Sequence, residues 1–139
     1  MLCTIVTDAS FCPETNVGGW AAWVVCNDVR EKQYGAFKDL CKSATEAEIK
    51  AAINGAFIAK RSFSQITRYH FVTDCEAVIR YIEKRNNQWW QIIEDIVGQS
   101  EVTVKHVRAH KNTGSARSWV NGWCDKKARR EMRKARDSR

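Results

Sequence analysis

The first third of the chain leaves no room for a helix, because strand-like segments follow one another with only short polar turns between them. The expected strands are residues 2–8, 20–26 and about 32–37. A turn over 11–17 separates the first two, and Asn27-Asp28 separates the last two. Strands joined by such short connections pair antiparallel. We therefore predict an antiparallel meander at the start of the fold.

From residue 44 the pattern changes to a helical period. Small side chains recur at helical spacing through 44–60, and Ser43 with Glu46 three residues later resembles a capping box. Beyond this helix we expect strands at 69–73 and 102–107, helices at about 75–85 and 87–98, and a last helix from near Asn121. Strands alternating with helices after an all-strand start predict a mixed α/β sheet with helices on its faces.

Composition restricts the class of protein. The 139 residues fit one domain, and 44% hydrophobic with 28% charged residues exclude a disordered or fibrous chain. No apolar run approaches the ~18 residues of a membrane span. The N-terminal residues lack the pattern of a secretory signal. We expect a cytoplasmic monomer with no membrane partner.

Six cysteines are spread along the chain, at positions 3, 12, 26, 41, 75 and 124. They form no CxxC pair, so a structural zinc site is not expected. Without an export signal we expect reduced thiols, buried as small apolar side chains.

The net charge of +7 lies almost entirely at the C-terminal end, where residues 126–139 hold eight Lys or Arg against two acidic residues. A basic segment of this kind suggests a polyanionic partner, usually nucleic acid. A solvated helix end is the alternative interpretation.

Carboxylates follow two of the expected strands. Asp8 ends the first strand and Asp74 follows 69–73, so the two could lie side by side at the carboxyl ends of parallel strands. Glu48 lies among apolar residues of the expected helix, where a carboxylate is costly unless it is paired or binds a metal. Asp125 stands at the start of the last expected helix.

Clustered carboxylates need a compensating cation, and oxygen ligands suit Mg²⁺, with Mn²⁺ as its substitute. Two such ions can catalyse an in-line phosphoryl displacement. Taken singly, each acid could instead be a turn residue at a strand end or a helix N-cap.

Several segments resemble type 1 ribonuclease H, in the order of that family and over nearly the whole chain. They are 4–10 with 18–21, 45–52, 71–75, and 104–110 with 124–128. The helices at 75–85 and 87–98 leave no room between them for a basic protrusion, so the resemblance is to a compact form. It implies the ribonuclease H-like α/β fold, with a five-stranded mixed sheet of order 3-2-1-4-5 flanked by helices. The catalytic domain would cover 1–125, and 126–139 would be a basic C-terminal extension of the same domain.

The resemblance also implies a function: an endonuclease that hydrolyses the RNA strand of RNA/DNA hybrids and leaves 5′-phosphate and 3′-hydroxyl ends. Asp8, Glu48, Asp74 and Asp125 would hold two Mg²⁺ ions. His110 would assist proton transfer or product release. The expected substrate contacts are Ser10, Ser43, Thr45, Glu76, Arg85, Asn86, Lys126, Arg129 and Arg130.

Two alternatives stay open at this point. A nuclease of the same fold could act on junction or transposon DNA, or the chain could be a non-catalytic RNA/DNA-binding module. The stretch from 111 to 124 is longer than in many members of the family and contains Trp119. It could be simple loop drift or a lid with a base-stacking group. Trp20 and Trp23 should face opposite sides of their strand, and Trp89 should be more exposed than Trp90.

Overall fold

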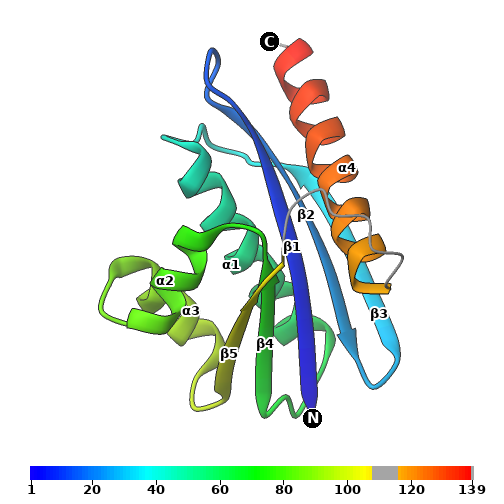
Figure 1. Cartoon of the computed structure of the whole chain (residues 1–139), viewed down its shortest axis with the longest axis vertical. Helices are drawn as coiled ribbons and strands as arrows, with labels where there is room; N and C mark the ends of the chain where they lie inside the picture. The colour runs from blue at the N-terminus through cyan, green and yellow to red at the C-terminus, as the bar shows by residue number, and fades with distance from the viewer. Residues whose placement is uncertain (108–115, 139) are drawn as a thin grey trace.

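The structure, a computed structural model, describes the backbone of residues 1–107 and 116–138 and the side chains of 1–107 and 119–138. A five-stranded sheet of order β3-β2-β1-β4-β5 separates α1, α2 and α3 on one face from α4 on the other (Figure 1). This is the predicted α/β fold and the predicted strand order. The elements are β1 (Leu2–Cys12), β2 (Val17–Cys26), β3 (Val29–Ala36), α1 (Ala44–Ser62), β4 (Arg68–Thr73), α2 (Glu76–Lys84), α3 (Gln88–Val97), β5 (Glu101–His106) and α4 (Ala116–Asp137).

The sheet is mixed, because β1 pairs antiparallel with β2 and parallel with β4. Asn27 and Asp28 both have positive φ, at 47° and 65°, and connect β2 to β3 as a two-residue turn. Primed turns of this type suit a hairpin. The first turn is shorter than the predicted 11–17, since Phe11 and Cys12 still pair with β2.

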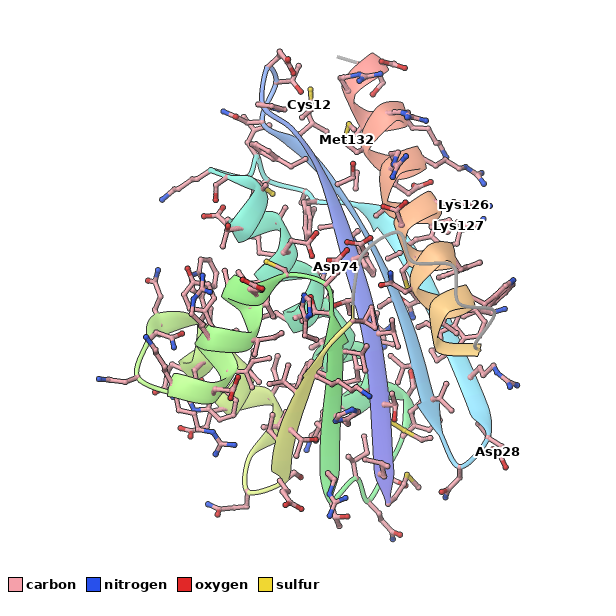
Figure 2. All side chains as sticks on the ribbon, in the orientation of Figure 1. Cys12, Asp28, Asp74, Lys126, Lys127 and Met132 are labelled. Carbon is pink, nitrogen blue, oxygen red and sulfur yellow. A yellow bond between two sulfur atoms is a disulfide. The ribbon has the colours of Figure 1, made fainter. Side chains whose placement is uncertain are left out.

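Two separate sets of buried side chains hold helices to the two faces. The larger cluster lies under α1, α2 and α3 and includes Tyr69 and Phe71. The smaller clusters lie under α4, where Cys124 and Ala128 contact β1, β2 and β4 and Met132 lies near Cys12 (Figure 2).

The tryptophans divide between these faces. Trp20 packs against the larger cluster and Trp23 lies in a smaller one, on the opposite face as predicted. Trp90 is buried. Trp89 is half-buried against the same core, and it is therefore more exposed than Trp90, as predicted.

Glycines allow two of the helices to approach the sheet closely. A Cβ atom on Gly19 of β2 would collide with the backbone of Ala128 and Met132 in α4. A Cβ on Gly55 of α1 would collide with the side chains of Ile5 and Thr7 in β1. A larger residue at Gly19 would therefore require the α4 backbone to shift, and one at Gly55 would require the Ile5 and Thr7 side chains to move.

The last helix begins at Ala116 rather than near Asn121, so residues 116–124 are helical and the interpretation of 111–124 as one long loop was wrong. Tertiary packing explains the difference. Trp119 and Trp123, one turn apart, both contact Trp23 edge-on, with ring centroids 5.4 and 5.2 Å from it. This packing outweighs the low helix propensity of Gly122. Among the described helices, none is long and apolar enough to cross a membrane.

Cys3 and Cys26 form a disulfide, which corrects the expectation that all six cysteines are reduced. The two residues are partners in the β1–β2 register. Their separation of 23 residues gives no hint of this pairing in the sequence. Cys12, Cys41 and Cys124 are buried thiols as expected, and Cys75 is half-buried.

Candidate active site

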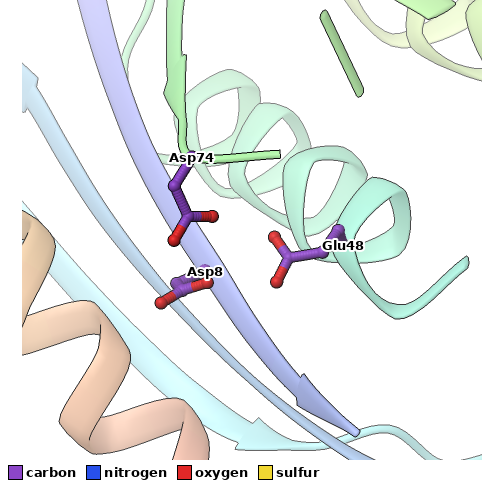
Figure 3. Close-up of side chains that lie close together, drawn as sticks. All are labelled: Asp8, Glu48 and Asp74. Atoms are coloured by element: carbon purple, nitrogen blue, oxygen red, sulfur yellow. The ribbon is translucent and has the colours of Figure 1, made fainter. Parts of the chain in front are cut away.

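Asp8, Glu48 and Asp74 converge from three elements on one point (Figure 3). Asp8 lies on β1, and Asp74 directly follows β4. Because Val6 pairs with Val72 in the parallel register, the two aspartates stand at the same level of neighbouring strands. Glu48 reaches them from the second turn of α1. One carboxylate oxygen from each residue lies within 4.8 Å of the others.

The start of α1 fixes where Glu48 points. Ser43 Oγ accepts a hydrogen bond from the Glu46 amide at 3.0 Å, and Glu46 Oε1 accepts one from the Lys42 amide at 3.2 Å. The Ser43 bond is the first half of the predicted capping box, whereas Glu46 accepts from the amide before the N-cap rather than from that of Ser43. These bonds leave Glu48 one turn later, beside β1.

A backbone amide orients two of the carboxylates. The Ala9 N–H donates to Asp8 Oδ1 at 2.9 Å and to Glu48 Oε1 at 3.1 Å. Glu48 Oε2 is buried and has no hydrogen-bond partner among the described residues. A buried carboxylate oxygen without a donor is costly, and a cation would satisfy it.

Burial and mutual repulsion change the acidity of the cluster. Burial, and then repulsion from Asp74, raises the pKa of Asp8 to about 7. Burial, and then repulsion from Asp8 and Asp74, raises the pKa of Glu48 to about 11. The three groups therefore cannot all ionise at neutral pH unless a cation joins them. The all-oxygen donor set and the unpaired Glu48 oxygen fit a hard divalent cation.

Asp125 lies beside the cluster rather than in it. Its charge helps to raise the pKa of Asp8, so it faces the site. Its Oδ2 accepts a hydrogen bond of 2.6 Å from Arg129 Nη2. Since α4 begins at Ala116, Asp125 lies well inside the helix and is neither its start nor its N-cap. The structure thus brings three of the four predicted ligands together and places the fourth next to them.

A histidine that the sequence analysis did not single out stands at the same edge of the sheet. His106 ends β5, pairs with Thr73 in the register, and has Nε2 3.3 Å from the Asp74 carbonyl oxygen. Its position near the end of a predicted strand could have indicated from the sequence that it lies close to Asp74. His110, the histidine predicted to be functional, lies outside the described residues.

Four of the predicted substrate contacts lie within five residues of a clustered carboxylate in the sequence. Ser10 lies two residues beyond Asp8 on β1, and Thr45 precedes Glu48 by three residues in α1. Ser43 is the exposed N-cap of α1. Glu76 is the exposed first residue of α2, two residues after Asp74. Their contacts with substrate stay predictions.

The other predicted contacts lie further from the cluster or on α4. Arg85 donates to the Val102 carbonyl at 3.2 Å and lies 4.6 Å above the Trp90 ring, so it supports packing near the start of β5. Asn86 is exposed in the α2–α3 connection, and Lys126 and Arg130 are exposed on α4. Arg129 is bound to Asp125 as described. For these residues too, a role in substrate binding stays a prediction.

Comparisons with known proteins identify the family of the chain. The family model described as RNase H matches residues 2–133. No curated protein matches the chain.

Solved structures share the fold at low sequence identity. The N-terminal RNase H domain of a Mycobacterium tuberculosis protein, solved as a fusion with maltose-binding protein, has a TM-score of 0.77 at 17% identity, covering 99% of this chain and 97% of that one. RNase H1 from the halophilic archaeon Halobacterium salinarum has a TM-score of 0.72 at 12% identity, covering 96% of this chain and 99% of that one. LC11-RNase H1 in complex with an RNA/DNA hybrid has a TM-score of 0.73 at 12% identity, covering 96% of this chain and 98% of that one. The family match over nearly the whole sequence shows that the chain belongs to the RNase H family, as its resemblance to type 1 ribonuclease H implies.

Proposed function

We propose that this ribonuclease hydrolyses the RNA strand of RNA/DNA hybrids, with Asp8, Glu48, Asp74 and Asp125 as ligands of two Mg²⁺ ions, for which Mn²⁺ can substitute. The observation that carries the proposal is the convergence of three carboxylates around a buried, unpaired Glu48 oxygen. Membership of the RNase H family and the hybrid bound by LC11-RNase H1 support the choice of substrate.

The chain's own residues prepare the site for a phosphoryl displacement. The Ala9 amide orients Asp8 and Glu48 together. Divalent ions bound by such carboxylates supply positive charge for the attacking and leaving oxygens. The products would carry 5′-phosphate and 3′-hydroxyl ends. Assistance by His110 in proton transfer or product release stays a prediction.

Recognition of RNA would depend on its 2′-hydroxyls, which lie in the wide minor groove of the hybrid. Ser10, Thr45 and Glu76 offer polar groups on the three segments that carry the clustered carboxylates. We propose that they contact these hydroxyls, with Ser43, Arg85 and Asn86 as further contacts. Lys126, Arg129 and Arg130 on α4 would hold backbone phosphates.

The test is cleavage of an end-labelled RNA/DNA hybrid in Mg²⁺, beside EDTA, duplex DNA and single-stranded RNA. Asp8→Asn should abolish cutting. Asp28→Asn is the matched control, since it makes the same change to an exposed carboxylate in the β2–β3 turn, away from Asp74 (Figure 2). We expect metal-dependent cutting of only the RNA of the hybrid, unchanged in the control.

Other results would replace the proposal. Cutting of branched DNA in place of the hybrid would indicate a nuclease acting on junction or transposon DNA. Hybrid binding without cutting in either Mg²⁺ or Mn²⁺ would indicate a non-catalytic module.

We also propose that the protein works as a cytoplasmic monomer. The three clustered carboxylates all come from a single chain, so their convergence needs no second subunit. Sedimentation should give a mass near 16.0 kDa, and a dimeric mass would contradict the monomer.

A further inference from the structure

A cluster of aromatic rings and cations lies where α4 crosses β2 and β3, and the proposed hydrolysis uses none of it. We call this surface the aromatic face; it consists of Trp23, Arg30, Lys32, Tyr34, Trp119, Trp123 and Lys127. Arg30, Lys32 and Tyr34 alternate along β3 and so point to the same side of the sheet. Lys32 pairs with Trp23 in the register, and its Nζ lies 5.0 Å from the centre of that ring.

Residues of α4 form the rest of the aromatic face. Lys127 Nζ lies 4.8 Å from the Tyr34 ring and 5.9 Å from the Trp123 ring. Trp119 is 62% exposed and Tyr34 is 42% exposed, although both are large and apolar enough to favour burial. Exposed aromatic groups gathered in one place mark binding surfaces more often than isolated ones do.

A cavity of about 600 Å³ opens beside these rings. Trp23, Val25 and Trp119 give it apolar walls, and Arg30 contributes a cation. Ligand pockets in proteins have volumes of about 300–1,000 Å³, which is ample for a nucleobase. An apolar cavity beside indole rings, with a guanidinium at its edge, suits a base and its phosphate.

The aromatic face points away from the carboxylates. Trp123 and Lys127 are each two residues from Asp125, so they lie about 200° from it around the helix axis. The β2–β3 turn, next to Arg30, is at the end of the sheet remote from Asp74 (Figure 2). A ligand held by Tyr34, Trp123 and Lys127 would therefore not occupy the cluster of Asp8, Glu48 and Asp74. The cavity beside these rings reaches Val6, two residues before Asp8 on β1.

The charge of the aromatic face complements a polyanion. Its charged members are all cations, from β3 and α4. Glu31 belongs to the opposite side of β3 by the alternation of side chains, where it accepts a hydrogen bond from Gln33. Aromatic rings interleaved with cations are the usual means of binding single-stranded nucleic acid, because bases stack on the rings while cations hold the phosphates.

We propose that the aromatic face is a binding site for single-stranded nucleic acid. Unpaired bases stack on Trp119 and Tyr34 and enter the cavity, and Arg30, Lys32 and Lys127 hold the backbone. The proposal goes beyond hydrolysis of the hybrid. It is tested without metal, so it stands or fails independently of the catalytic proposal.

The first arm measures binding of fluorescein-labelled dT15 in EDTA by fluorescence anisotropy. Trp119→Ala should weaken binding by at least about fivefold, the loss expected for one stacked base. Trp119→Phe should restore most of it. Phe57→Ala is the matched control, because Phe57 is 54% exposed and lies near Arg61 on the other face of the sheet. It should bind as wild type does.

The second arm measures the salt dependence of the same binding. The double variant Arg30→Gln/Lys32→Gln should reduce the slope of log K against log salt by about 1.4, or 0.7 for each phosphate contact to a single strand. Lys60→Gln/Arg61→Gln removes the same charge from the end of α1 and should leave the slope unchanged.

Wild-type affinity in both Trp119→Ala and the Arg30/Lys32 double variant, with unfolding temperatures showing that both are folded, would overturn the proposal. Equal losses in the target and control variants would overturn it as well. Wild-type affinity in both variants would indicate that the aromatic face is a docking surface for protein instead.

Discussion

Arg129 Nη2 lies 2.6 Å from Asp125 Oδ2, so the carboxylate nearest the cluster on α4 is already paired with a cation from its own helix. Asp8 and Glu48 are arranged differently, because both accept from the Ala9 amide, and burial and repulsion raise the pKa of both. The site therefore has one carboxylate paired with a guanidinium, whereas Asp8 and Glu48 ionise only at a cost that a bound cation would relieve. A divalent ion that binds Asp125 must share or displace this guanidinium.

Removing the guanidinium should strengthen metal binding. We expect Arg129→Ala to bind Mn²⁺ up to about fivefold more tightly, since a partly exposed ion pair contributes up to ~1 kcal/mol. Isothermal titration calorimetry measures this directly. Arg133→Ala, which removes an exposed cation one turn further along α4, is the control and should bind as wild type does. Weaker Mn²⁺ binding in Arg129→Ala would contradict the prediction.

The metal-free protein should lose stability as pH rises from about 4 to 8. The folded pKa of Asp8 is about 7 against 3.8 in the unfolded chain, and the folded pKa of Glu48 is about 11 against 4.5. Folding raises the pKa of both carboxyl groups. Their contribution to the stability of the folded protein is therefore complete below the unfolded pKa and is lost as pH rises through the folded pKa.

Asp8→Asn removes the ionisable group, so it should lose less stability over this pH range. We expect it to be more stable than wild type by at least about 1 kcal/mol at pH 8 in EDTA, with a smaller difference at pH 5. Urea unfolding at both pH values measures the difference. A difference that stays constant with pH would show that Asp8 does not titrate in this way.

Divalent ions should stabilise the folded protein through the same cluster. At a Mg²⁺ concentration 100 times the dissociation constant, the free energy of unfolding should rise by about 2.7 kcal/mol. Glu48→Gln should lose most of this gain, because it removes the buried oxygen that lacks a partner. Glu83→Gln, an exposed change on α2, should keep it. Differential scanning calorimetry with and without Mg²⁺ distinguishes them, and equal gains in both variants would refute a metal site at Glu48.

Two glycines should respond oppositely to the same substitution. Gly19→Ala should destabilise the protein by about 3 kcal/mol, because its Cβ would meet the backbone of α4. Gly122→Ala should stabilise it by about 1 kcal/mol, since Gly122 is inside the helix and no described atom lies within 4 Å of the added Cβ. Chemical denaturation measures both. A neutral Gly19→Ala would mean that α4 can move away from β2.

Local pattern was sufficient to predict the type of each element but not where it ends. The period change near residue 44 and the Asn27-Asp28 turn both correspond to structure. The β1 strand extends to Cys12 because Phe11 and Cys12 pair with residues of β2. The sequence pattern around Pro13 predicts a turn there and does not reveal this pairing. The early start of α4 likewise depends on Trp23, nearly 100 residues away in the chain.

For the candidate site, residues at strand ends could be predicted to meet, but their partners could not. The parallel pairing of β1 with β4 brings Asp8 beside Asp74, as their positions predicted. The pairing of Asp125 with Arg129 depends on both residues being helical, whereas the sequence pattern placed Asp125 at a helix start. The Cys3–Cys26 bond depends on a strand register that composition does not encode.

The separation of the two buried layers has a consequence for biosynthesis. Every buried residue of the larger cluster precedes residue 105, whereas the clusters under α4 require residues 124 to 132. As the ribosome releases the chain from its N-terminus, the layer with α1, α2 and α3 can form while α4 is still unmade. Asp8, Glu48 and Asp74 would then already be in place, and the arrival of the last helix would add Asp125 and the aromatic face in a single late docking step.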